Sequence, residues 1–149
     1  MIGMVLIGHE HIASQMLAAV EHVVEKQPLT AVLDVSGDDN PDALRQQLDV
    51  LIRSCDVGDG VLLLADMFGG TPCNVAIAAL RPGKVEVVSG FNLPLLIKAA
   101  TLRQSLNDLS ALAHQVVEAG RQYMCLPSHL MDENAQQDCA PAEGDRTDA

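Results

Sequence analysis

The sequence predicts an α/β protein: a three-layer sandwich whose doubly wound, mostly parallel sheet lies between two layers of helices. Short, continuously apolar segments alternate along the chain with longer segments whose apolar residues recur every three or four positions. A short segment that is apolar throughout is typical of a strand buried on both faces of a parallel sheet. The alternation indicates right-handed β-α-β units, and we expect the common strand order 2-1-3-4.

The first predicted strand, residues 2–7, ends at the sequence Gly8-His9-Glu10-His11. A helix follows, because the next apolar residues fall on one helical face; they are Ile12, Met16, Ala19, Val20, Val23 and Val24. Pro28 ends this region, since proline interrupts a helix, and residues 29–35 form the second predicted strand.

The second helix is predicted to start at the pair Asn40-Pro41. Its buried stripe consists of Leu44, Leu48, Leu51 and Ile52. The third strand, residues 61–65, follows a glycine-containing turn, and a helix is expected over residues 71–80. We expect Thr71 to be the N-cap of this helix and Pro72 its first residue.

The last third of the predicted domain contains a fourth strand, residues 85–88, and two helices, residues 93–102 and 105–119. Gly120 is expected to end the second of these helices. Residues 122–126 are then predicted to form a final short strand.

The chain divides into one predicted domain, residues 1–126, and an acidic tail, residues 127–149. Residues 128–149 contain six acidic side chains, one arginine and no periodic apolar pattern. Such a composition predicts disorder, because it offers too little apolar surface to bury.

Charge and cysteine content exclude several classes of protein. The net charge of −11 argues against binding to nucleic acid or to anionic membranes. No apolar run approaches the roughly 20 residues that span a bilayer, so direct membrane insertion is not expected. Four scattered cysteines without a CxxC pair indicate neither a zinc site nor a disulfide framework; they are Cys55, Cys73, Cys125 and Cys139. A cytoplasmic protein is expected.

Two side chains that could take part in a reaction follow neighbouring strands of the predicted sheet. His9 follows the first strand and Asp66 follows the third, and these strands are adjacent in the order 2-1-3-4. Ligands of such sheets bind beyond the carboxyl ends of the strands, where the strand order reverses. A histidine with a carboxylate on one ring nitrogen keeps its other nitrogen free as a nucleophile or base.

The turn Gly69-Gly70-Thr71 adds a candidate anion site to this pair, because it precedes a predicted helix. A nucleophilic nitrogen, an orienting carboxylate and an anion pocket are the parts needed to accept a phosphoryl group. The same turn without a ligand is also compatible with this stretch alone.

Three segments resemble the mannose/fructose-type IIA proteins of the bacterial phosphotransferase system. Residues 66–74, Asp-Met-Phe-Gly-Gly-Thr-Pro-Cys-Asn, resemble the family signature D-x-[FWY]-G-G-[ST]-P-x-N. Residues 2–9 resemble the first strand and histidine of the family, and residues 88–96 resemble its segment V-x-G-x-N-[LI]-P-[ML]-L. Gly120-Arg121 also matches, and the resemblance covers residues 1 to about 126.

This resemblance implies that His9 carries a transient phosphoryl group, received from the phosphocarrier HPr and passed to a IIB component. Asp66 would bind the other imidazole nitrogen, while Thr71 and the neighbouring backbone amides of Gly69 and Gly70 would hold the phosphate. Secondary site candidates are Glu10, His11, Phe68, Asn74 and Asn92. The family requires no metal and no cofactor. Its members are homodimers whose last strand, here residues 122–126, crosses to the partner sheet and pairs antiparallel.

Two residues depart from the family pattern. Gly8 stands where the family commonly has Ser or Thr, and Glu10 stands where it usually has Gly. Glu10 removes backbone freedom at the turn and adds a negative charge near the expected phosphate. His11 is a competing candidate for phosphorylation, but the register of the first strand and helix favours His9.

Three alternatives remain beside the transport role. The same phosphoryl acceptor could belong to a stand-alone regulatory protein that binds a target according to its phosphorylation state. His9, Glu10, His11 and His22 could instead be metal ligands, although their spacing suits a helix face poorly. A phosphocarrier that works with dihydroxyacetone kinase would share the fold, but the Gly-Gly-Thr-Pro-x-Asn sequence argues against it.

Overall fold

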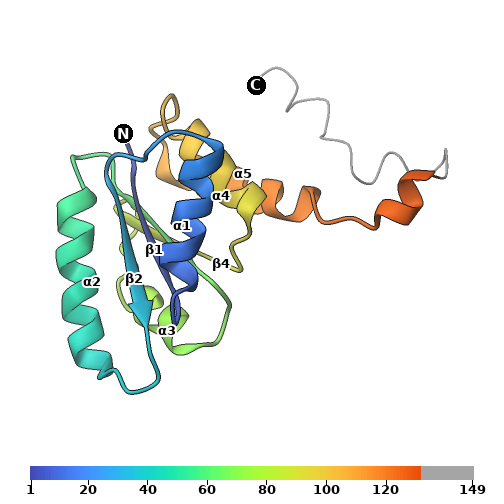
Figure 1. Ribbon diagram of the computed structural model, residues 1–149. Helices are drawn as coiled ribbons and strands as arrows, with labels where there is room; N and C mark the ends of the chain where they lie inside the picture. Colours follow the sequence, from blue (N-terminus) through green and yellow to red (C-terminus); the bar gives the residue numbers. More distant parts are fainter. Residues whose placement is uncertain (132–149) are drawn as a thin grey trace.

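The computed structural model describes residues 1–131 and contains a four-stranded, all-parallel sheet (Figure 1). The strands are β1 (Gly3–His9), β2 (Thr30–Val35), β3 (Val61–Ala65) and β4 (Val85–Ser89). Their order in the sheet is β2-β1-β3-β4, which confirms the predicted fold class and strand order.

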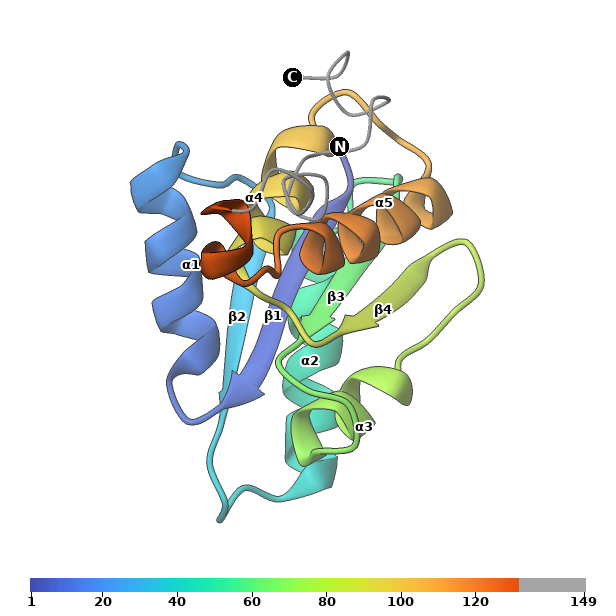
Figure 2. The same ribbon diagram turned by 90° about the vertical axis from the view of Figure 1, so that its right-hand side faces the viewer.

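Five helices form the two outer layers of the sandwich. One face of the sheet is covered by α1 (Ile12–Val23), α4 (Leu93–Leu102) and α5 (Leu109–Gln122), as Figure 2 shows. The opposite face is covered by α2 (Pro41–Cys55) and α3 (Thr71–Ile77). Helices therefore cover both faces of the sheet, as the continuously apolar strands predicted.

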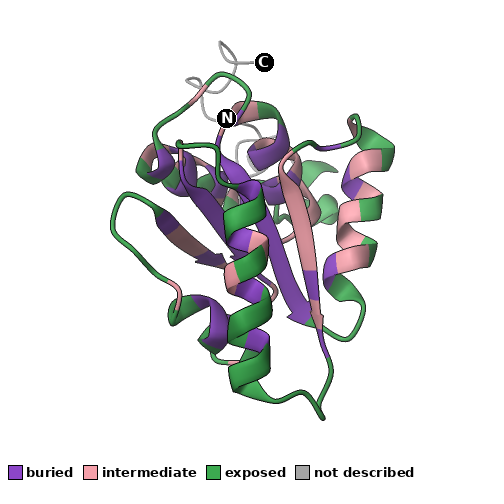
Figure 3. Ribbon diagram, turned by 90° about the vertical axis from the view of Figure 1, so that its left-hand side faces the viewer, coloured by how far each residue is buried: buried purple, intermediate pink, exposed green. Residues whose placement is uncertain are grey.

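Successive strand residues point to opposite faces and fill two separate cores. The core beneath α1, α4 and α5 includes the strand residues Met4, Leu6, Leu62, Leu64 and Val88. The core beneath α2 and α3 includes the strand residues Val5, Ile7, Leu33, Val35 and Leu63. Figure 3 shows the central strands buried and the outer surface of α2 exposed.

Local sequence signals set the starts of α2 and α5. The Asn40 side chain accepts hydrogen bonds from the backbone N–H groups of Asp42 and Ala43, and Pro41 is the first residue of α2. In the same way, Asp108 caps α5 by accepting a hydrogen bond from Ala111. These polar caps satisfy N–H groups that have no partner within the helix.

The third helix differs from the prediction at both ends. Gly70, not Thr71, is the N-cap of α3, and Thr71 is the first helical residue. The helix ends at Ile77 rather than at residue 80. The sequence signal placed the cap one residue late because threonine and glycine both occupy N-cap positions.

The predicted final strand, residues 122–126, is absent from the described part of this chain. Gln122 is the last residue of α5, and the residues after it pair with no strand there. Gly120 does not end the helix as predicted. A side chain at this position would come within 3.0 Å of Leu95 Cδ1, so the glycine lets α5 approach α4 closely.

The segment after α5 leads into a short 3₁₀ helix, η1 (Pro127–Met131). Several apolar side chains between α5 and the end of η1 are exposed; they are Tyr123, Met124, Leu126, Leu130 and Met131. The predicted acidic tail lies outside the described residues from residue 132 onward.

Candidate functional site

The carboxyl ends of β1 and β3 bring His9 and Asp66 together. The two strands are paired up to Ile7 and Ala65, so the residues that follow emerge side by side. Asp66 Oδ2 lies 2.7 Å from His9 Nδ1 and accepts a 2.9 Å hydrogen bond from the His9 backbone N–H. One carboxylate oxygen therefore fixes both the backbone and the ring of His9. The predicted pairing is confirmed by these distances.

Asp66 is the buried member of the pair, and His9 is the accessible one. The Asp66 side chain is 7% exposed and that of His9 is 47% exposed. The other Asp66 oxygen, Oδ1, accepts a hydrogen bond from the Met67 backbone N–H at 2.9 Å. The carboxylate is thus held by hydrogen bonds at both oxygens, while one edge of the imidazole faces solvent.

Opposing effects act on the pKa of Asp66. Burial raises it, because the charged form loses hydration, but the backbone and ring hydrogen bonds from His9 lower it. Further lowering comes from the charge of His9 and the hydrogen bond from Met67, and the net pKa of Asp66 is below its ordinary value. Asp66 is therefore ionised at neutral pH. An ionised carboxylate requires hydrogen at Nδ1, which leaves the lone pair at Nε2 of neutral His9.

The backbone of Gly70 lies directly beside this free nitrogen. A Cβ atom at Gly70 would lie 3.1 Å from His9 Nε2 and 2.7 Å from His9 Cε1. Only glycine leaves this space open. The preceding Gly69 has φ +91°, a backbone conformation that other residues rarely adopt. The glycine pair therefore serves both the turn and the approach to Nε2.

The first turn of α3 opens toward the same region. Its N-cap residue, Gly70, has no side chain that could accept a hydrogen bond from the helix. Thr71, at the first helical position, is exposed. First-turn N–H groups have no intrahelical acceptor, although Pro72 contributes none. Phe68, in the turn before the glycines, is 74% exposed, and Asn74 is exposed on α3.

The structure assigns Asn92 a place in the framework. Its Oδ1 caps α4 by accepting a 3.0 Å hydrogen bond from the Leu95 N–H. Its Nδ2 donates a 2.8 Å hydrogen bond to the Gly120 carbonyl oxygen in α5. Asn92 therefore joins α4 to α5, and its side chain makes these contacts rather than one to His9.

The two residues after His9 lie in the turn between β1 and α1. Glu10 is exposed and has φ +50°, which is uncommon for a residue other than glycine. His11 occupies the N-cap position of α1, with a side chain that is 82% exposed and Nδ1 3.5 Å from Asp34 Oδ2. Before His9, a side chain on Gly8 would come within 2.4 Å of Ile12 Cγ2, so the Ser or Thr common in the family would require the Ile12 side chain to shift.

Sequence reasoning missed Asp34 and Ser14, which lie beside this turn. Asp34 accepts hydrogen bonds from both the backbone N–H and the hydroxyl of Ser14. The available signal was an acidic residue at the carboxyl end of the second predicted strand, next to the strand that carries His9.

The metal-binding alternative gains no support from the geometry. Within residues 1–131, no group of three or more His, Cys, Asp or Glu side chains is arranged to hold a metal ion. His22 lies in the last turn of α1, whereas His9 and His11 precede its first turn. In the same part of the chain, no helix has the length and apolar character needed to cross a membrane.

Fold and site define an α/β protein with an oriented, solvent-accessible histidine where the strand order of a parallel sheet reverses. Residues 3–117 match the family EIIA-man, described as the fructose IIA component of the PTS. Because this match covers more than half of the chain, the protein belongs to that family of phosphotransferase-system components.

Curated and solved relatives agree with this family. The mannose-specific EIIAB component of the PTS of Escherichia coli K12 is 30% identical over 125 residues, which are 81% of this chain. The chain spans only 38% of the length of that relative. The sorbose-specific EIIA component of Lacticaseibacillus casei is 26% identical over 90% of this chain and 96% of its own length.

A solved structure is similar over nearly the whole fold. The mannose/sorbose-specific IIA subunit from Enterococcus faecalis has a TM-score of 0.75 and 27% identity. The similarity covers 84% of this chain and 93% of that subunit.

Proposed function

We propose that this protein is a phosphoryl carrier that accepts a phosphoryl group from phospho-HPr on Nε2 of His9 and passes it to a IIB component. The observation that carries the proposal is the 2.7 Å contact between His9 Nδ1 and Asp66 Oδ2. It leaves Nε2 as the free nucleophile beside the glycine turn. Membership of the IIA family supports the same role.

In the proposed reaction the lone pair of His9 Nε2 attacks phosphorus and forms a nitrogen–phosphorus bond. The nitrogen–phosphorus bond to the donor histidine breaks, and its electron pair returns to that imidazole. Positive charge develops on the His9 ring, and the ionised carboxylate of Asp66 stabilises it. Transfer to the IIB component reverses these steps, so no other reactant is consumed.

The phosphoryl oxygens are assigned in this proposal to the turn formed by Gly69, Gly70 and Thr71. The support for this assignment is the close approach of Gly70 to Nε2 and the exposed hydroxyl of Thr71. Backbone N–H groups and a hydroxyl can donate hydrogen bonds to phosphate without a metal ion.

Around His9 the surface combines apolar and acidic groups. Met67 and Phe68 are 53% and 74% exposed in the turn next to His9. Glu10, Asp38 and Asp39 are exposed on loops that leave the same edge of the sheet. We assign this face to the binding of HPr and of the IIB component. Each partner is expected to present basic side chains around an apolar centre that complements it. The proposal places the carrier in the cytoplasm, in line with the free thiols of Cys55, Cys73 and Cys125.

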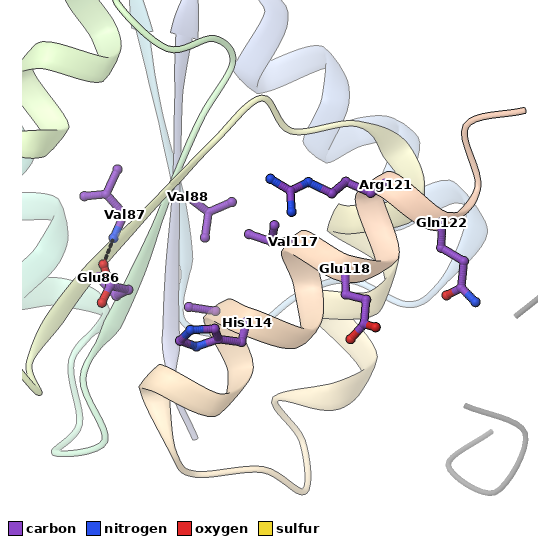
Figure 4. A pocket seen from close by; sticks show the side chains of 9 residues that line it. Glu86, Val87, Val88, His114, Val117, Glu118, Arg121 and Gln122 are labelled. Carbon is purple, nitrogen blue, oxygen red and sulfur yellow. Dashed lines mark hydrogen bonds between the residues drawn. The ribbon is translucent and has the colours of Figure 1, made fainter. Parts of the chain in front are cut away.

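The proposal also includes a homodimer. β4 is an edge strand, and a groove of about 670 Å³ runs between it and α5 (Figure 4). The Val87 N–H on this strand donates a 3.0 Å hydrogen bond to Glu86 Oε1 instead of to another strand. An exposed apolar segment, residues 123–126, follows α5. In this proposal, residues 123–126 of a second copy pair with the exposed edge of β4.

Light scattering tests the dimer. The double variant Met124→Asp, Leu126→Asp changes two exposed side chains, so the fold of one chain should survive. A dimeric wild type and a monomeric variant are expected. A monomeric wild type at micromolar concentration would contradict the homodimer.

Phosphorylation by labelled phosphoenolpyruvate with Enzyme I and HPr tests the carrier role. Wild type and His11→Ala are expected to acquire label that is labile to acid and stable to alkali, whereas His9→Ala acquires none. His11→Ala is the matched control, because it removes an imidazole two residues away. Label lost in His11→Ala and retained in His9→Ala would overturn the assignment. Label that no IIB component accepts would favour the regulatory alternative.

A further inference from the structure

A second carboxylate holds the turn that carries His9, and it comes from a different strand than Asp66. Asp34 lies near the carboxyl end of β2, where it is the register partner of Gly8 in β1. Gly8 has no side chain, and the start of α1 lies over it, with Ile12 Cγ2 only 2.4 Å from the position of a Cβ atom. The ends of β1 and β2 therefore meet the beginning of α1 (Figure 2).

Asp34 makes three contacts to this helix start. Its Oδ1 accepts a hydrogen bond of 3.1 Å from the Ser14 backbone N–H, and its Oδ2 accepts one of 2.7 Å from Ser14 Oγ. Oδ2 also lies 3.5 Å from His11 Nδ1. The Asp34 side chain is 27% exposed, so these contacts are partly shielded from water.

These contacts replace a cap that α1 does not have in its own sequence. His11 at the N-cap position makes no side-chain hydrogen bond to the helix, and the first turn contains no acidic residue. The N–H of Ser14 belongs to this first turn, and the carboxylate of Asp34 also complements the positive end of the helix dipole. A helix capped from a neighbouring strand is fixed relative to that strand.

The segment from His9 to Ser14 is consequently attached at both ends to a carboxylate. Asp66 binds the backbone and ring of His9 at one end, and Asp34 binds Ser14 at the other. Between them Glu10 has φ +50°, and its N–H donates to the Val35 carbonyl oxygen at 2.8 Å. A turn in a strained conformation persists only where the surrounding contacts hold it.

We propose that Asp34 is a positioning residue for phosphoryl transfer at His9. By fixing the first turn of α1, Asp34 keeps the His9 ring against Asp66 with Nε2 directed outward. This inference rests on the proposed function of His9 as the phosphoryl acceptor. Phosphoryl transfer depends mainly on positioning, so a loosened ring lowers the rate of transfer without changing how the donor protein binds.

The test compares four proteins: wild type, Asp34→Ala, Asp34→Asn and Glu25→Gln. The asparagine variant keeps one oxygen for the Ser14 N–H, so its defect should be smaller than that of the alanine variant. Glu25→Gln removes the same charge from an exposed position beyond the carboxyl end of α1 and is the matched control. We expect kcat for labelling by phospho-HPr to fall about tenfold in Asp34→Ala, with KM for the donor unchanged and the control like wild type.

Nitrogen-15 NMR of the histidine rings supplies a readout that needs no phosphoryl transfer. Wild-type His9 is expected to show one tautomer with hydrogen at Nδ1, and Asp34→Ala is expected to show exchange between tautomers. An unchanged His9 ring with an unchanged kcat, or a raised KM with an unchanged kcat, would overturn the inference.

A folding defect is separated from a positioning defect by Ser14→Ala. This variant removes the hydroxyl contacts to Asp34 and to the His11 carbonyl oxygen, and it keeps the hydrogen bond from the Ser14 N–H to Asp34. This variant should fold and show a smaller fall in kcat of the same kind. A normal kcat in both Ser14→Ala and Asp34→Asn would reject the positioning role. Failure of wild type to become labelled would reject the proposed function instead, while the NMR comparison would still decide whether Asp34 orders the His9 ring.

Discussion

At the residue scale, the carboxylate of Asp66 acts on His9 in two ways. Its Oδ2 accepts hydrogen bonds from the backbone N–H and lies 2.7 Å from the ring nitrogen Nδ1. The first contact places the Cα of His9, and the second sets the ring orientation and its tautomer. An amide of the same shape carries no negative charge, and its NH₂ group cannot accept the hydrogen bond from the Met67 N–H.

Asp66→Asn is therefore expected to impair transfer more than folding. The asparagine amide carries no charge to stabilise a positive imidazole, so we expect labelling of His9 to slow about 100-fold or more. The rate of labelling by phospho-HPr measures the effect, and circular dichroism checks the fold. A variant with the wild-type rate would show that Asp66 does not act on the His9 ring.

The lowered pKa of Asp66 also predicts how stability depends on pH. Because this pKa is lower in the folded than in the unfolded protein, the ionised carboxylate stabilises the folded state. This contribution is fully present above the ordinary carboxyl pKa of about 4 and is lost as pH falls through the folded value. Urea unfolding of wild type and Asp66→Asn should thus converge toward acidic pH. A difference in unfolding free energy that grows below pH of about 4 would contradict the argument.

Glu10 combines an unfavourable backbone conformation with a charge beside the proposed phosphate. Glu10→Gly removes both features, whereas Glu10→Gln removes only the charge. We expect both variants to increase the phosphorylated fraction at equilibrium about threefold, because a carboxylate repels the dianion. Only the glycine variant should also relieve the strain of φ +50° and raise the melting temperature. An unchanged phosphorylated fraction in both variants would mean that the carboxylate points away into solvent.

At the element scale, the turn between β3 and α3 is shaped around His9. Gly70→Ala would place a methyl group 2.7 Å from His9 Cε1 and 3.1 Å from Nε2. Since Gly70 has φ −87°, alanine fits the backbone, and the expected effect falls on the site rather than on the fold. We predict that the rate of labelling falls about tenfold or more. Gly37→Ala is the control, because nothing lies within 4 Å of that position, and equal rates in both variants would refute the prediction.

Arg103, the fully buried residue that follows α4, ties the layer of α4 to the start of the sheet. Its guanidinium donates hydrogen bonds to five oxygens, those of the Ile2, Pro28 and Leu29 carbonyls and of the Gln27 and Thr30 side chains. Arg103→Met removes the guanidinium donor from these oxygens, and we expect a loss of about 3 kcal/mol in unfolding free energy. Urea unfolding measures it. Arg53→Met, at an exposed position of α2, is the control and should change little.

Local patterns predicted the elements that local interactions determine. The pair Asn40-Pro41 predicts the start of α2 because the cap lies within four residues of the helix it serves. By contrast, the sequence predicts a strand over residues 122–126, but in the structure Gln122 is the last residue of α5. A short apolar run does not distinguish the end of a helix from a strand. The sequence also predicts that Gly120 ends the helix. In the structure this glycine instead makes room for Leu95, and that role depends on tertiary packing.

The same distinction applies to the site. The pairing of His9 with Asp66 was predictable, because strand order alone brings two strand ends together. The role of Asp34 was not, since it depends on the register of β2 against β1 and on the absence of a cap within α1. Asn92 belonged to a matched motif, and only the packing of α4 against α5 shows what its side chain binds.

At the scale of the whole molecule, the acidic net charge acts on a partner over a longer distance than any other surface property. The net charge is −11, and exposed acidic residues lie on the loops beside His9. An acidic face attracts a basic partner before contact and raises the rate of association, and salt screens this attraction. Apolar contacts through Met67 and Phe68 would then hold the complex, with little dependence on salt.

Salt should consequently act on encounter with the donor and not on the transfer step. Between about 0.05 M and about 0.5 M salt, we expect KM for phospho-HPr to rise about tenfold while kcat changes little. The double variant Glu10→Gln, Asp38→Asn should show a weaker dependence, because it removes two charges from the acidic face. Phe68→Ala should raise KM equally at every salt concentration. If KM were independent of salt, or fell as salt increased, charge attraction would not guide the donor to His9, and the apolar turn at Met67 and Phe68 would account for recognition alone.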